Sequence, residues 1–147
     1  MDIEIVYQLI LALILGSIVG LERELKKRGA GLQTYSLVAL GSCLFTIIAF
    51  ELIDFFVGQP IITFDPSRII QAVAIGVGFI GGGVIFRQGA GIAGLTTAAG
   101  LWVAAAVGVA IGAKFYFLAI VATLLALFIL VVFGFFEKKF IDKKLKK

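Results

Sequence analysis

The sequence predicts an all-α membrane protein, a glycine-rich bundle of five transmembrane helices. Of its 147 residues 61% are hydrophobic and only 15% are charged. Five apolar runs are each long enough to cross a hydrocarbon core of about 30 Å. A soluble domain of this composition would have too few polar groups to cover its surface, so a soluble enzyme is not expected.

The five predicted spans lie in one domain, residues 1–136. They run approximately over residues 5–21, 32–53, 69–86, 92–111 and 115–136. Helices are expected because they satisfy their own backbone groups in lipid. Asp65 is expected to cap the third span, with Pro66 at its first position. Residues 137–147, with six lysines, form a predicted basic cytoplasmic tail.

The distribution of basic residues predicts the orientation in the membrane. If the N-terminus is outside, all but two of the 13 lysines and arginines face the cytoplasm. The exceptions are Arg68 and Lys114. Because positive charge accumulates on the cytoplasmic side, we expect the N-terminus outside and the C-terminus in the cytoplasm.

The composition also limits the chemistry. The chain has no histidine and one cysteine, Cys43, so it cannot build a zinc site, a disulfide or a Ser-His-Asp triad from its own side chains. We expect no cofactor, no catalytic residue and no assigned metal site. The basic residues lie at the ends of apolar runs rather than along a polar face, which indicates membrane lipids and not nucleic acid as the anionic partner.

The segment between the first two spans contains candidate functional charges. Glu22 and Lys26, and likewise Glu24 and Arg28, have the i,i+4 spacing of helical ion pairs, which extends the first helix by about two turns. Gly-Ala-Gly then ends it. Two interpretations stay open: a solvated helix end with ion pairs of small value, or a partner or ion site in which Arg23, Glu24 and Arg28 face other helix ends.

Glycines four residues apart predict close helix packing. The pairs are Gly16 and Gly20, Gly78 and Gly82, and Gly108 and Gly112. Such spacing lets helix backbones approach in lipid, and packing is favoured over a permeation path. One of these faces is expected to form a homodimer.

The two predicted cytoplasmic turns resemble each other. Each has an arginine, a Gly-Ala-Gly sequence and a Gly-Leu-x-Thr helix start. We hypothesise a parallel repeat of two helical hairpins, with Thr34 and Thr97 at equivalent depths and the fifth helix outside. The full candidate cytoplasmic cluster is Glu22, Arg23, Glu24, Arg28, Thr34, Arg87, Thr96 and Thr97.

Residues 20–34, the run GFIGGGVIF and the run GLTTAAGLW together resemble the membrane domain of the MgtC/SapB family. The resemblance implies a multi-pass bacterial inner-membrane protein linked to adaptation to low magnesium and to survival in host cells. It also implies regulation of membrane partners, among them the ATP synthase. Gln33 replaces an arginine usual in the family, and the chain resembles a short, membrane-only member.

Three functions remain open. A regulator is favoured because the middles of the spans contain no ionisable residue, which a transporter usually needs. The alternative is a small oligomeric channel or transporter for Mg²⁺ or another cation, with Glu51, Asp54 and Asp65 attracting the ion as oxygen ligands. An enzyme using Glu22, Glu24 and Arg87 is the least favoured, because no nucleophile, metal motif or phosphate loop accompanies them.

Overall fold

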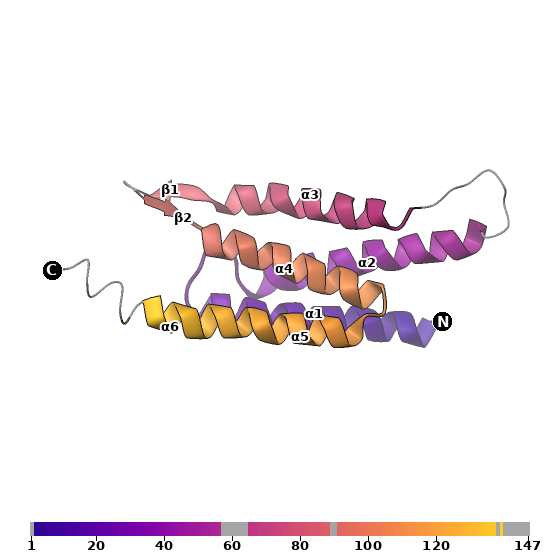
Figure 1. Cartoon of the computed structure of the whole chain (residues 1–147), viewed down its shortest axis with the longest axis horizontal. Coiled ribbons are helices and arrows are strands. Elements are labelled where there is room, and N and C mark those ends of the chain that lie inside the picture. Colours follow the sequence, from indigo (N-terminus) through magenta and orange to yellow (C-terminus); the bar gives the residue numbers. More distant parts are fainter. Residues whose placement is uncertain (1, 57–64, 89–90, 138, 140–147) are drawn as a thin grey trace.

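The computed structural model describes residues 2–56, 65–88, 91–137 and 139. Its membrane helices are α1 (Asp2–Leu25), α2 (Leu32–Phe56), α3 (Ser67–Val84), α4 (Leu95–Gly112), and a fifth helix made of α5 (Tyr116–Phe128), the π-helical segment η1 (Ile129–Phe133) and α6 (Gly134–Phe136) (Figure 1). All five are long and apolar enough to cross a membrane, which confirms the predicted fold class. Most of the predicted basic tail lies outside the described residues.

The connection between α3 and α4 differs from the prediction. The third span was predicted to end at residue 86 and the fourth to begin at residue 92. In the structure a short antiparallel hairpin occupies this region, formed by β1 (Phe86–Gln88) and β2 (Gly91–Ala93). Gly94 has a left-handed backbone with φ of 91°. A Cβ there would lie closer than 3.0 Å to the Val84 carbonyl, so only glycine lets the chain turn into α4.

Glycines on α1 and α4 hold α2 between these two helices. At Gly16, Gly20, Gly108 and Gly112 an added Cβ would come closer than 3.0 Å to atoms of α2. The backbones therefore approach more closely than any larger residue allows, as the glycine spacing predicted. By contrast, no atom of the described residues lies within 4 Å of such a Cβ at Gly78 or Gly82, so these two glycines do not pack against another described helix.

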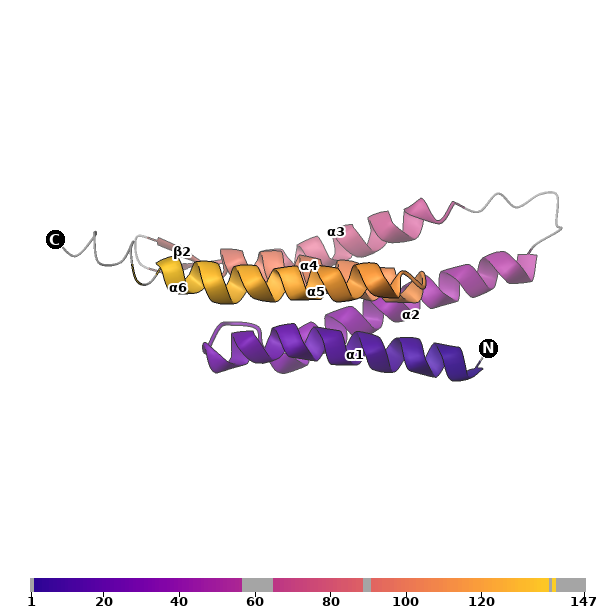
Figure 2. The ribbon, with the colours of Figure 1, turned by 60° about the horizontal axis from the view of Figure 1, so that its bottom comes forward.

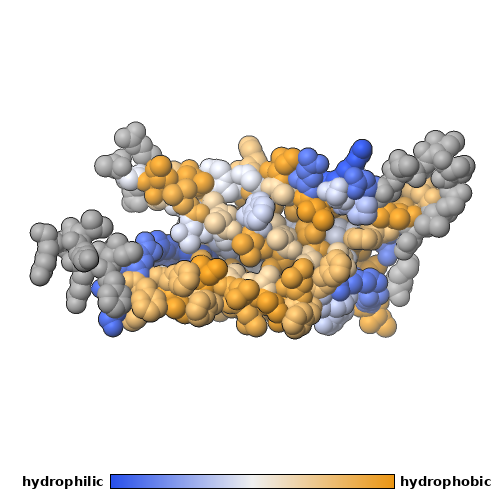
Figure 3. Space-filling view, viewed as in Figure 1, coloured by the Kyte–Doolittle hydropathy of each residue, from blue (hydrophilic) through white to orange (hydrophobic). Residues whose placement is uncertain are grey.

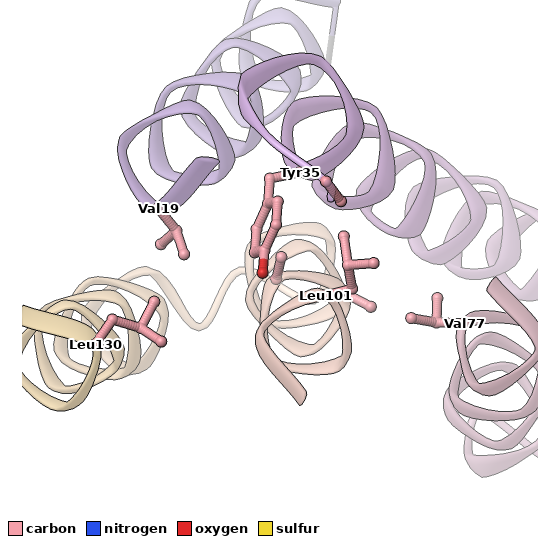
Figure 4. Packing of buried hydrophobic residues seen from close by; sticks show 8 residues of the cluster. Val19, Tyr35, Val77, Leu101 and Leu130 are labelled. Carbon is pink, nitrogen blue, oxygen red and sulfur yellow. The ribbon is translucent and has the colours of Figure 1, made fainter. Parts of the chain in front are cut away.

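The buried apolar residues form two clusters, of which α3 contributes to only one. The first cluster takes residues from all five membrane helices (Figure 4): Val19, Tyr35, Val77, Leu101 and Leu130. The second, built around Cys43 and Ile111, contains residues of α1, α2, α4 and α5. In two views α3 lies at the edge of the bundle (Figures 1 and 2), because within the described part of the chain only Val77 and Gly81 of this helix are buried.

The outer surface of the bundle suits a lipid environment. A band of hydrophobic side chains covers α5, with hydrophilic residues at the two ends of the molecule (Figure 3). Several buried polar side chains donate to helix carbonyls: Gln8 Nε2, for example, donates to Ile111 O at 2.8 Å and to Gly112 O at 3.1 Å. These two bonds join α1 to the end of α4.

Candidate functional site

The last turn of α1 carries a compact cluster of charges at the predicted cytoplasmic end. Arg23 Nε donates to Glu22 Oε2 at 2.5 Å, and Lys26 Nζ lies 2.5 Å from Glu22 Oε1. The side chains of Arg23 and Glu22 are only 4% and 10% exposed. The predicted Glu22–Lys26 pair is thus confirmed, and Arg23 and Glu22 are largely buried, whereas the Lys26 side chain is 29% exposed.

Lys26 also reaches the fifth helix. Its Nζ donates to Leu130 O at 2.8 Å. Leu130 lies in η1, where π-helical pairing replaces the regular i→i+4 ladder. An added Cβ at Gly134 would lie 3.3 Å from the same Nζ, so this glycine leaves room for the lysine. Sequence patterns do not predict this contact, because the apolar run of η1 has the composition of an ordinary helix.

The predicted pair of Glu24 and Arg28 does not form. Lys27 has a left-handed backbone, φ of 52°, and the helix ends before Arg28 reaches the i+4 position. Instead, Glu24 Oε2 accepts the N–H of Leu32, the first residue of α2, at 3.1 Å. An added Cβ at Gly31 would overlap the Glu24 carboxylate, so this glycine makes room for the cap. Arg28 is exposed.

The two threonines at the start of α4 have different environments. Thr97 is buried, and its carbonyl accepts the hydroxyl of Tyr35 at 2.9 Å. Thr96 is exposed. A Cβ at Gly100 would lie closer than 3.0 Å to the Tyr35 hydroxyl, so this glycine and the tyrosine are matched. The prediction missed Tyr35 because tyrosine in an apolar helix has no distinctive spacing.

The structure does not bring the predicted cluster together as one site. Thr34 faces a groove between α2 and α3, whereas Thr97 lies in the bundle core. The backbone of Arg87 pairs with Ile92 in the hairpin. The two turns predicted to be cytoplasmic therefore differ in local structure, and the two-hairpin repeat stays a prediction.

The charges at this end of α1 connect helix ends. Lys26 joins α1 to η1 and pairs with Glu22, which also accepts from Arg23, while the exposed Glu24 joins the end of α1 to the start of α2. Among the described residues, no group of three or more His, Cys, Asp or Glu side chains is arranged to hold a metal ion. The side chain of Asp54, one of the acids expected to attract Mg²⁺, lies outside the described part.

Comparison with known proteins decides the family. The model of the MgtC family matches residues 9–139. The chain belongs to the MgtC family. It is 42% identical to the "putative magnesium transporter YhiD" of Escherichia coli K12 over 133 residues, 90% of this chain and 62% of that protein. It is 43% identical to "Protein SapB" of Bacillus subtilis over 116 residues, 78% of this chain and 50% of the relative. It is 41% identical to "Protein MgtC" of Brucella abortus over 112 residues, 76% of this chain and 44% of that protein.

This MgtC-family chain spans about half to three-fifths of the length of the curated relatives it matches. No solved structure matches it. Five apolar membrane-spanning helices and these relatives identify it as a multi-pass protein of the bacterial inner membrane.

Proposed function

We propose that this chain is a regulatory membrane protein that acts by binding another membrane protein, or a second copy of itself, through the outward face of α3. The single observation that carries the proposal is the composition of this face. Gly78 and Gly82 have open space around them, beside Phe79, which is 86% exposed. The family resemblance implies the ATP synthase as one such partner.

Glycine on an exposed helix face has a physical cost that a partner would offset. It is worse than alanine in a helix interior by about 1 kcal/mol, and lipid chains do not need a close backbone approach. A partner helix does need it, because van der Waals packing drives helix association in membranes. The glycines of α1 and α4 are already used in this way inside the chain.

The alternative is cation transport, which the printed name of the Escherichia coli relative suggests for that protein. The buried polar groups of this chain support regulation instead. Gln8, Tyr35 and Ser36 bond to carbonyls of the bundle and so join or brace its helices. Groups committed to helix contacts are poorly placed to line an aqueous path for a hydrated divalent ion.

Two measurements distinguish regulation through a bound partner from cation transport. In proteoliposomes, Mg²⁺ entry is expected to equal that of protein-free vesicles, and Mg²⁺-dependent flux would instead support transport. In native membranes, chemical crosslinking is expected to capture a protein partner or dimer. Gly82→Leu should abolish this capture, while Gly76→Leu, an equally open glycine on another side of α3, should retain it.

A further inference from the structure

A long groove separates α2 from α3. Its volume is about 1010 Å³. In α3, Val77 and Gly81 are buried and Val73 and Val84 are partly buried against the same core cluster, while most other described residues of this helix are exposed. Among the described residues, no atom lies within 4 Å of a Cβ added at Gly41 on α2 or at Gly76 on α3, which shows that the groove is open at these two residues.

Between its ends the groove is mostly apolar, with Ser42 as the polar residue beside Gly41. Its larger apolar lining residues on the two helices include Leu37, Val38, Phe45, Ile69, Val73 and Ile80. Such a surface within the span matches the hydrocarbon chain of a lipid.

One end of the groove carries two opposite charges. Asp65 and Arg68 both line it where α3 begins, and both are exposed. Within the described part of the chain they form no ion pair with each other. Asp65 Oδ1 accepts the N–H of Ser67 at 2.9 Å, and the Asp65 side chain is exposed at the mouth of the groove. Hydrophilic residues gather over this end of α3 (Figure 3).

We propose that the groove binds a zwitterionic phospholipid of the phosphatidylethanolamine type. The Arg68 guanidinium receives the phosphate, and the Asp65 carboxylate receives the ammonium group. An acyl chain lies along the apolar lining past Gly41 and Gly76. The charge complementarity is specific: one cation and one anion at the same end fit a head group that carries both charges, whereas an anionic head group would face repulsion from Asp65.

Native mass spectrometry of the full chain tests the head-group part. The protein is extracted in mild detergent and offered equal amounts of phosphatidylethanolamine and phosphatidylglycerol. We expect one retained phosphatidylethanolamine per chain. Arg68→Gln should lower this retention about tenfold, the effect of one charge-assisted hydrogen bond. Asp65→Asn keeps a helix-capping side chain but should shift the preference toward phosphatidylglycerol.

Two glycine variants test the acyl-chain part. Gly76→Leu fills the groove and should lose the retained lipid, whereas Gly78→Leu, outside the groove lining, should keep it. Circular dichroism checks that each variant is folded. Equal retention in both glycine variants, or a head-group preference unchanged by Asp65→Asn, would overturn the proposal. A retained second protein copy that disappears in Gly76→Leu would also overturn it, since the groove would then hold a helix.

Discussion

The third and fifth membrane helices are equally exposed but differ in composition. Only 17% of each span is buried inside the chain. The fifth helix covers its outer side with large residues such as Phe117 and Leu124, whereas α3 presents Gly78 and Gly82 next to the exposed Phe79. Large apolar side chains suit lipid contact, and small ones suit a protein backbone. Exposure within the chain therefore does not by itself distinguish a helix that faces lipid from a helix that binds another protein.

The two helices are also fastened differently. The fifth helix has a polar contact near each end: Lys26 bonds to Leu130 O, and Lys114 pairs with Glu4 where the chain enters α5. The contacts of α3 with the core are apolar: Val77 and Gly81 are buried, and Val73 and Val84 are partly buried against the same cluster. Four predictions test the contacts that hold the bundle together, for comparison with the exposed α3, beginning with the largest expected effect.

Gly108→Leu should be the most damaging change. A side chain there must push α2 and α4 apart, because even a Cβ would come closer than 3.0 Å to the Ala39 carbonyl. We expect a loss on the order of 3 kcal/mol, measured as unfolding in detergent or as loss of protein from membranes. Gly78→Leu, in open space, should leave stability unchanged. Equal damage from both variants would contradict the proposed difference between the core and α3.

Lys26→Met should loosen the end of the fifth helix. It removes an ion pair and the hydrogen bond to Leu130 O, with an expected loss of about 2 kcal/mol. Hydrogen exchange should accelerate over η1 and α6 but not over α3. Lys27→Met is the matched control, since Lys27 is exposed. Identical exchange in the two variants would show that Lys26 does not fasten the helix.

The contact between Tyr35 and Gly100 should appear as coupling in a double-mutant cycle. Tyr35→Phe removes the bond to Thr97 O, at a cost of about 1 kcal/mol. Gly100→Ala places a methyl group against the hydroxyl and should cost about as much or more. In the double variant the clash is relieved, so the combined loss should be smaller than the sum. Simple additivity would contradict the contact.

The smallest effect is expected from alkaline pH. The hydrogen bond with Glu4 raises the pKa of Lys114 above its usual value of 10.5. Its contribution to stability is therefore complete below this value and is lost as the pH rises through the higher folded pKa. The Tm should fall more in the wild type than in Lys114→Met over this window. The difference should be small, because both side chains are about half exposed.

Much of the fold follows from sequence patterns. Long apolar runs define the helices, and the glycines of α1 and α4 indicate their contacts with α2. The same spacing did not predict that Gly78 and Gly82 lack a contact in the chain, because a glycine pair does not specify its partner.

The site was less predictable than the fold. Spacing found the Glu22–Lys26 pair but paired Glu24 with Arg28, because it cannot show where the left-handed Lys27 ends the helix. The bond from Lys26 to Leu130 O depends on a π-helical backbone and on residues far apart in the chain. Such contacts arise from tertiary packing between distant residues, which local sequence patterns do not predict.

Site-specific photo-crosslinking compares the outer faces of α3 and the fifth helix most directly. A photoreactive phenylalanine derivative is placed in native membranes at Phe79, 86% exposed, or at Phe117, 82% exposed. We predict a protein adduct, either a second copy or another membrane protein, from Phe79 and only lipid adducts from Phe117. Lipid adducts alone from both positions, or equal protein adducts from both, would contradict the assignment of α3 as the partner-binding helix.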